Sequence, residues 1–559
     1  MQTGLQTLDY CVFLVYFIVV AGYGFWIYNQ KKQAETSSAD YFLAEGSLTW
    51  WAIGASLIAS NISAEQFIGM SGNGFRLGLA ISTYEWMAAA TLMIVAIFFM
   101  PIYLKNRIFT MPQFLNQRYD GRVSMVMAIF WLLLYVFVNL TSILYLGALA
   151  VSKIANLDIM LCMYVLATFA IFITLGGMKV IGYTDVIQVF FLVLGGLATT
   201  YLALNMVADK FGGDGAVAGF KIMMQKTPDH FHMIFDKDND NFMSLPGLTV
   251  LIGGMWIVNL NYWGCNQYIT QRALGADLPT ARSGLLFASF LKLLMPVIVV
   301  LPGIAAYVLH QNGMFQTEML GKDGTISQDN AYPVLLNLLG PGLKGLAFAA
   351  LTAAIVASLA GKANSISTIF TLDIYHTFIK KDASEKQLVN LGRWAIVGAM
   401  AIAVLFAPHM GIDKKGGFEF IQEFTGFVSP GVFAMFILGF FWKRTTANAA
   451  LFAIIGGFAA SVFFKFLPTF ANLEGLHSLG FSAFSKDSQL WEMPFIDRMG
   501  FVFLICVAGM VIISLLDSTS KDNPKGLEVD ASMFKMSNSF TVGALIVLGT
   551  LVALYTMFW

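Results

Sequence analysis

The sequence predicts an all-α polytopic membrane protein with about 14 transmembrane helices, and three observations support this prediction. Of its 559 residues, 57% are hydrophobic and only 12% are charged, whereas soluble domains carry about 25% charged residues. Apolar runs of roughly 20 residues, the length that crosses a bilayer, recur along the chain. The 33 basic and 33 acidic residues cancel, so nucleic acid is not an expected partner. We expect one transmembrane unit over residues 1–559.

The apolar runs place the expected helices in order. A leading helix over 7–29 precedes two groups of five spans, and further helices fill the C-terminal part, 446–559. Span centres lie near residues 18, 58, 92, 136, 166, 194, 256, 296, 356, 398, 430, 456, 507 and 549. The segments 208–244, 309–340 and 467–496 are expected to be outer loops with short surface helices.

Basic residues indicate the orientation. When the N-terminus is placed outside, Lys31, Lys32, Lys105 and Arg107 fall in short inner connections, as do most other Lys and Arg residues of the short connections. The positive-inside rule then favours a multi-pass protein of the cell inner membrane with both termini on the outer, periplasmic side.

Two spans contain polar clusters, at Ser60–Gln66 and at Asn259–Gln267. Polar backbone at membrane depth is tolerated where it faces a cavity or protein rather than lipid. The clusters lie five spans apart, so the segments 49–207 and 244–443 would have opposite orientations. Broken first helices in matching positions are typical of transporters built from inverted repeats. The alternative is that both clusters are polar contacts between ordinary packed helices.

Five stretches resemble the sodium:solute symporter family, in particular its sodium/galactose and sodium/glucose cotransporters. They are Ala55–Met87, Thr184–Gly196, Asn261–Arg272, Lys292–Tyr307 and Phe420–Gly431. The resemblance runs from about residue 40 to the C-terminus. It implies a 5+5 inverted-repeat core of the leucine-transporter type, sodium as coupling ion, and a secondary active transporter rather than an enzyme.

The resemblance implies a site for a galactose-like or glucose-like hexose. Such a sugar needs hydrogen-bonding groups together with an aromatic face. The implied hydrogen-bonding residues are Gln66, Glu85, Asn259, Lys292 and Gln422, with Tyr262 stacking on the sugar as inner gate. The implied outer gate is Met70, Tyr84 and Phe418.

Some features of this sugar site keep alternatives open. A lone Glu or Lys inside a span is costly and usually functional, but Glu85 and Lys292 could also be an ion pair that holds two helices together. Ala88 stands where the galactose transporters have a serine that contacts the sugar. The sequence therefore leaves open which hexose or related polyol is carried.

The resemblance also implies a sodium site. Sodium prefers oxygen ligands, which an unwound helix supplies through its carbonyl groups. The implied ligands are the carbonyl groups of Ala59, Ile62 and Ala354 and the hydroxyl of Ser358, with Asp185 on the sodium exit route. Ala357 replaces a serine of the family, so the site is one hydroxyl short.

Lys362 follows Ser358 by four residues and so shares its helix face. One hypothesis is that its ammonium weakens or replaces bound sodium, which would give a sodium-independent or proton-coupled sugar carrier. Another is that it pairs with Asp185, and a third is that it snorkels toward the cytoplasm. A membrane sugar sensor is a more remote alternative. The sodium to sugar ratio, the affinity and the oligomeric state stay open.

Overall fold

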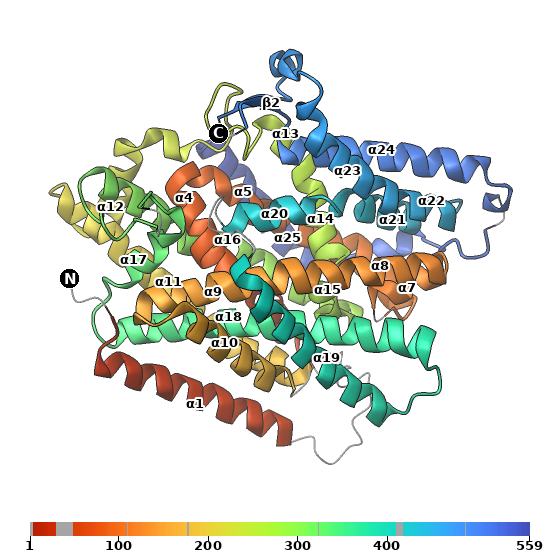
Figure 1. Cartoon of the computed structure of the whole chain (residues 1–559), viewed down its shortest axis with the longest axis horizontal. Coiled ribbons are helices and arrows are strands. Elements are labelled where there is room, and N and C mark those ends of the chain that lie inside the picture. Colours follow the sequence, from red (N-terminus) through yellow and green to blue (C-terminus); the bar gives the residue numbers. More distant parts are fainter. Residues whose placement is uncertain are drawn as a thin grey trace.

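The computed structural model describes residues 4–29, 48–108, 110–175, 178–321, 324–409, 417–486, 488–521 and 523–559. The predicted inner connection with Lys31 and Lys32 lies outside these residues. The leading helix α1 (Thr7–Asn29) has the predicted bounds and lies along one edge of the molecule, where it packs against α11 and α18 (Figure 1).

The α-helices of the first half follow α1 in chain order. They are α3 (Trp50–Asn61), α4 (Ser71–Leu77), α5 (Thr83–Ile94), α6 (Met100–Lys105), α7 (Met111–Arg118), α8 (Gly121–Leu133), α9 (Thr141–Ala155), α10 (Ile159–Thr174), α11 (Met178–Lys210) and α12 (Gly215–Lys226). The π-helical segment Glu65–Met70 leads directly into α4, Val95–Phe99 joins α5 to α6, and Leu134–Leu140 joins α8 to α9.

The second half continues in the same way. Its α-helices are α13 (Leu248–Ile252), α14 (Gly254–Gly264), α15 (Gln267–Leu274), α16 (Leu278–Gln311), α17 (Ala331–Leu336), α18 (Leu343–Thr368), α19 (Glu385–Phe406), α20 (Gly417–Gly426), α21 (Ser429–Phe441), α22 (Ala447–Leu451), α23 (Gly457–Phe466), α24 (Phe495–Leu516) and α25 (Asn538–Met557). π-Helical segments at Ile369–Ile379 and Phe452–Gly456 extend α18 and join α22 to α23.

Within the described residues, ten helical segments are long and apolar enough to cross a membrane. The bent pair α20 and α21, with an angle of 50° between its helices, adds an eleventh. The other three predicted spans are short or broken: α10 has 16 residues, α3 has 12, and α14 and α15 have 11 and 8. A length criterion therefore does not count α3, α14 and α15, the short helices beside the two polar clusters.

Both predicted breaks are confirmed as interruptions of helix. α3 ends at Asn61, Ile62 is extended, and helical structure resumes with the π-helical segment from Glu65. α14 ends at Gly264, and the Asn266 side chain caps the start of α15 by accepting a hydrogen bond from the Tyr268 amide at 3.2 Å. Asn favours such caps because its carbonyl oxygen replaces a missing intrahelical acceptor.

The predicted outer loops contain short helices, but the last of them also contains strands. β1 (Ala483–Ser485) pairs antiparallel with β2 (Leu490–Glu492), a short hairpin that the sequence did not predict in an otherwise helical fold. Three-residue strands give too little alternation to stand out from the surrounding loop.

Candidate functional site

A polar cavity lies where the two broken spans meet, and we call it the central cavity. All six residues predicted to bind the sugar line it, although they come from α5, α14, α16, α20 and the segment after α3. Its lining is Ser60, Asn61, Ser63, Glu65, Gln66, Tyr84, Glu85, Ala88, Asn139, Ile143, Val258, Asn259, Tyr262, Trp263, Asn266, Tyr268, Lys292, Lys362, Phe418, Ile421, Gln422 and Thr425.

One wall of the central cavity carries a buried ion pair. The Lys292 ammonium lies 2.5 Å from the Glu85 carboxylate and also donates a hydrogen bond to Asn61 Oδ1. Asn61 in turn donates from Nδ2 to the Tyr262 hydroxyl at 3.2 Å. The ion pair that was one alternative for Glu85 and Lys292 is therefore present, and it faces the cavity. Through Asn61 it is connected to Tyr262, the predicted inner gate.

Two aromatic rings close the cavity on the side of α20. The rings of Tyr84 and Phe418 lie 4.9 Å apart and nearly perpendicular, the edge-to-face geometry that aromatic pairs favour. A Cβ atom at Gly69 would lie 2.9 Å from Phe418 Cβ, so glycine permits this close approach. Met70 is fully buried but does not line the central cavity, unlike the other two residues of the predicted outer gate.

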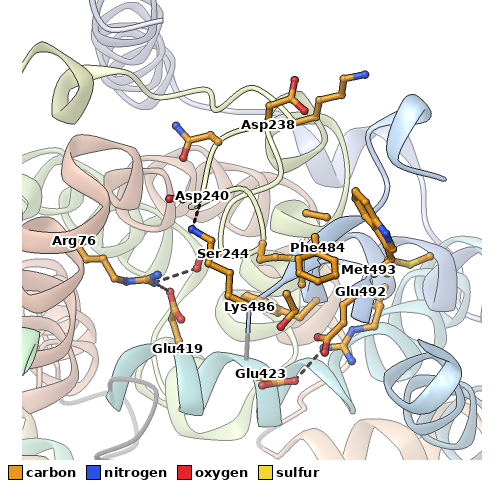
Figure 2. A pocket seen from close by; sticks show the side chains of 18 of the residues that line it. Arg76, Asp238, Asp240, Ser244, Glu419, Glu423, Phe484, Lys486, Glu492 and Met493 are labelled. Carbon is orange, nitrogen blue, oxygen red and sulfur yellow. Dashed lines mark hydrogen bonds and ion pairs between the residues drawn. The ribbon is translucent and has the colours of Figure 1, made fainter. Parts of the chain in front are cut away.

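A second, larger cavity of about 650 Å³ lies on the other side of α20, and we call it the vestibule (Figure 2). The outer segments predicted from the sequence supply much of its lining. Arg76 reaches across it to Glu419 and to Ser244, and Lys465 and Arg498 both contact Glu423 (2.5 and 3.1 Å). α20 thus presents Glu419 and Glu423 to the vestibule, and Phe418 and Gln422 to the central cavity.

Three of the four predicted sodium ligands, Ala59, Ile62 and Ser358, come together at the first break. The Ser358 hydroxyl lies 3.3 Å from the carbonyl oxygen of Ala59 and 3.4 Å from that of Ile62. The carbonyl of Ser60, which was not predicted, is also within 3.2 Å. Ala354 is buried one turn earlier on α18. Oxygens freed by an unwound helix and one hydroxyl are a chemically suitable donor set for sodium.

Asp185 is buried beside this site. It accepts a hydrogen bond from the Ser56 hydroxyl at 2.6 Å, and Ser56 accepts one from Arg272 Nε at 3.0 Å. Arg272 also contacts the Tyr268 carbonyl, and its guanidinium lies 5.1 Å from the Tyr268 ring. The contact of Arg272 with Ser56 was not predicted, although a charged residue on the helix that follows the second break was a signal that could have found it.

Lys362 is 3% exposed and does not snorkel, so that interpretation is wrong. Its ammonium donates to Asn139 Oδ1 at 3.0 Å and lies 3.8 Å from the centre of the Tyr268 ring. The proposed pairing with Asp185 is also wrong, because the hydrogen bond found for the Asp185 carboxylate in the described part of the chain comes from Ser56. Lys362 instead lines the central cavity.

Comparison with known proteins gives the family. The model of the sodium:solute symporter family matches residues 41–457. The chain belongs to this family. It is therefore a sodium-coupled secondary transporter and not an enzyme.

This symporter is similar to named relatives over most of its length. It is 45% identical to the sodium/glucose cotransporter of Vibrio parahaemolyticus, with 100% of this chain and 99% of the relative covered. It is 33% identical to human sodium/myo-inositol cotransporter 2, with 82% and 69% covered. A sodium-coupled sialic acid symporter, 20% identical, has the same fold with a TM-score of 0.75 over 92% of this chain and 98% of that one.

Proposed function

We propose that this symporter carries a monosaccharide, a hexose of the galactose or glucose type, together with sodium across the inner membrane by alternating access. The observation that carries the proposal is that all six sugar-binding residues predicted from the sequence line one cavity. The name of one relative, a sodium/glucose cotransporter, supports a hexose, and the other relative is named for myo-inositol, a cyclic polyol of similar size with a ring of hydroxyl groups.

The cavity offers the groups that a sugar requires. Glu85 accepts hydrogen bonds, Lys292 donates them, and the amides of Gln66, Asn259 and Gln422 do both. The Tyr262 ring supplies an apolar face for the C–H groups of the sugar. Because the Tyr262 hydroxyl bonds to Asn61, movement of this ring requires a change in the hydrogen bonds of the first break.

Sodium binding at Ala59, Ile62, Ala354 and Ser358 would fix the end of α3 against α18. The same break leads into the segment that carries Gln66, so the ion orders part of the sugar site. Coupling of this kind is reciprocal, because sodium and sugar favour the same state and each raises the affinity for the other. Asp185 and Arg272 lie next to this site, on the proposed exit route.

We further propose the finer topology. The described helices fit fourteen spans once the short α10 and the broken pairs are counted, with a 5+5 inverted-repeat core over 49–207 and 244–443, the remaining helices over 446–559, and both termini outside. Accessibility of single cysteines at either terminus to an impermeant thiol reagent, in oriented membrane vesicles, tests the orientation.

Uptake into proteoliposomes tests the transport function. Labelled glucose, galactose and myo-inositol are supplied under an inward sodium gradient and, as control, under an equal potassium gradient. Accumulation of a hexose only with sodium is the expected result. Equal uptake with both cations would contradict sodium coupling and favour Lys362 as a resident cation, and uptake of none of the sugars would contradict the substrate class.

A further inference from the structure

Lys362 and Glu65 both line the central cavity, and neither belongs to the predicted sugar-binding set. Lys362 is almost fully buried on α18, and its ammonium is surrounded by the Tyr268 ring at 3.8 Å, the Tyr135 ring at 4.9 Å and the Asn139 amide oxygen at 3.0 Å. An ammonium has three donors. Asn139 occupies one of them, so hydrogen-bonding capacity is left over toward the cavity.

Glu65 is the first residue of the π-helical segment that follows the first break. Its backbone amide donates to Ser63 Oγ at 3.1 Å. Its carboxylate makes no hydrogen bond or ion pair in the part of the chain that the structure describes. No ion pair joins Glu65 to Lys362 in the described residues, so their charged groups lie farther apart than the roughly 4 Å of such a pair although both line the central cavity. Two opposite charges thus share the cavity without direct contact.

A hydroxyl group fits between such charges. A carboxylate only accepts hydrogen bonds and an ammonium only donates them, whereas a hydroxyl does both at once. Hydrogen bonds to charged groups are also the stronger kind. A sugar hydroxyl placed between the two side chains would complete the hydrogen bonding of both buried charges.

We propose that Glu65 and Lys362 form a subsite that holds one hydroxyl of the transported sugar, which donates to the Glu65 carboxylate and accepts from the Lys362 ammonium. This inference rests on the proposed function, since it requires that the sugar binds in the central cavity. It makes Lys362 a specificity-determining residue rather than a substitute for sodium. Asn139 is then a positioning residue that orients the ammonium.

The test is a set of deoxy analogues of the transported hexose, each lacking a different hydroxyl. Each analogue competes with the labelled sugar for sodium-driven uptake by the unsubstituted protein, Lys362→Met, Glu65→Gln and the control Lys344→Met. Lys344 is a suitable control because it is also a buried lysine of α18, but its ammonium bonds to the Gly4 carbonyl, away from the cavity.

For the unsubstituted protein, we expect one analogue to inhibit about 10-fold to 100-fold more weakly than the parent sugar, the size of one hydrogen bond to a charged group. In Lys362→Met and Glu65→Gln, the parent sugar should inhibit more weakly by a similar factor. The analogue that lacks the bound hydroxyl should then inhibit as well as the parent sugar, while the other analogues behave as in the unsubstituted protein. This non-additivity identifies partners in contact. Lys344→Met should behave like the unsubstituted protein.

Persistence of the same penalty in both variants would overturn the subsite. A second result would also overturn it. If Lys362→Met leaves the relative inhibition by the analogues unchanged but alters the sodium concentration for half-maximal uptake, Lys362 belongs to the ion site. For a variant too slow to transport, binding of the parent sugar and of the analogue is read from tryptophan fluorescence in detergent. If the unsubstituted protein takes up no hexose, the proposed function fails and the subsite fails with it.

Discussion

The Lys292 ammonium lies 2.5 Å from the Glu85 carboxylate, and both side chains are buried. The two residues come from α16 and α5, which are far apart in the chain but packed side by side. A desolvated ion pair of this kind adds little net stability, but removal of one partner leaves an uncompensated buried charge. The pair therefore constrains two helices and supplies both signs of charge to the cavity.

Glu85→Gln should lower the stability of the protein by about 3 kcal/mol and abolish uptake, because Lys292 loses its counter-charge. Glu85→Gln combined with Lys292→Met should recover most of that stability while remaining inactive. Thermal unfolding in detergent and sodium-driven uptake measure the two effects. A double variant as unstable as Glu85→Gln alone would contradict this account of the pair.

Ser358→Ala should raise the sodium concentration for half-maximal uptake by about 10-fold, since one oxygen of the proposed ion site is lost. Ala357→Ser should lower the sodium concentration for half-maximal uptake, because it adds a hydroxyl beside the proposed ion site. Ser289→Ala is a matched control, because that hydroxyl is buried but bonds within α16 to Leu285. A sodium dependence unchanged in Ser358→Ala would place the ion elsewhere.

Arg76→Gln should favour opening of the cavity toward the vestibule, because Arg76 connects α4 to Glu419 on α20. Both side chains are partly exposed, so the expected effect is about 1 kcal/mol or less, a shift of up to about 5-fold. The four native cysteines are first replaced, and a single cysteine is introduced by Thr425→Cys, a position that lines the central cavity. The rate at which a thiol reagent labels this cysteine measures the opening. Lys486→Gln, which breaks a vestibule ion pair with Asp240 away from α20, should leave the labelling rate unchanged.

Stability should depend on pH through His230, which lies outside the spans in a short helix, Pro228–Phe231. Burial lowers the pKa of His230, although the Phe75 carbonyl and Asp229 partly oppose this shift. The folded state thus resists protonation of His230. The contribution of this residue to the free energy of unfolding is lost as the pH falls below about 6.5, the ordinary pKa of histidine.

The apparent melting temperature should accordingly fall less in His230→Gln than in the unsubstituted protein between about pH 7 and about pH 5. His232→Gln serves as the control, because His232 is exposed and bonds only to the Trp559 carbonyl in the described structure. Identical pH curves for the His230 variant and the unsubstituted protein would show that another group is responsible.

The two polar breaks could be predicted from the sequence because buried polar residues in an apolar run have few structural explanations. Ala59, Ile62 and Ser358 could be placed by resemblance, and the structure brings them together. The Ser60 carbonyl was not predicted, since backbone direction at a break depends on local dihedral angles rather than on residue type.

The contacts of Lys362 were not predictable in the same way. Helical spacing places it on the face of Ser358, but the direction of a long side chain is decided by its neighbours in space. Tyr135, Asn139 and Tyr268 come from two other segments of the chain, and they hold the ammonium inside the protein. Nothing in the sequence around Lys362 indicates these partners.

The partition between vestibule and central cavity is a single helix of ten residues, α20. Its charged side chains face one compartment and its sugar-site residues face the other. A rigid tilt of this one element would therefore break the Arg76 contact, separate Phe418 from Tyr84 and withdraw Gln422 in the same motion. Entry of the sugar and completion of its site cannot occur as independent events in a protein built with such a shared wall.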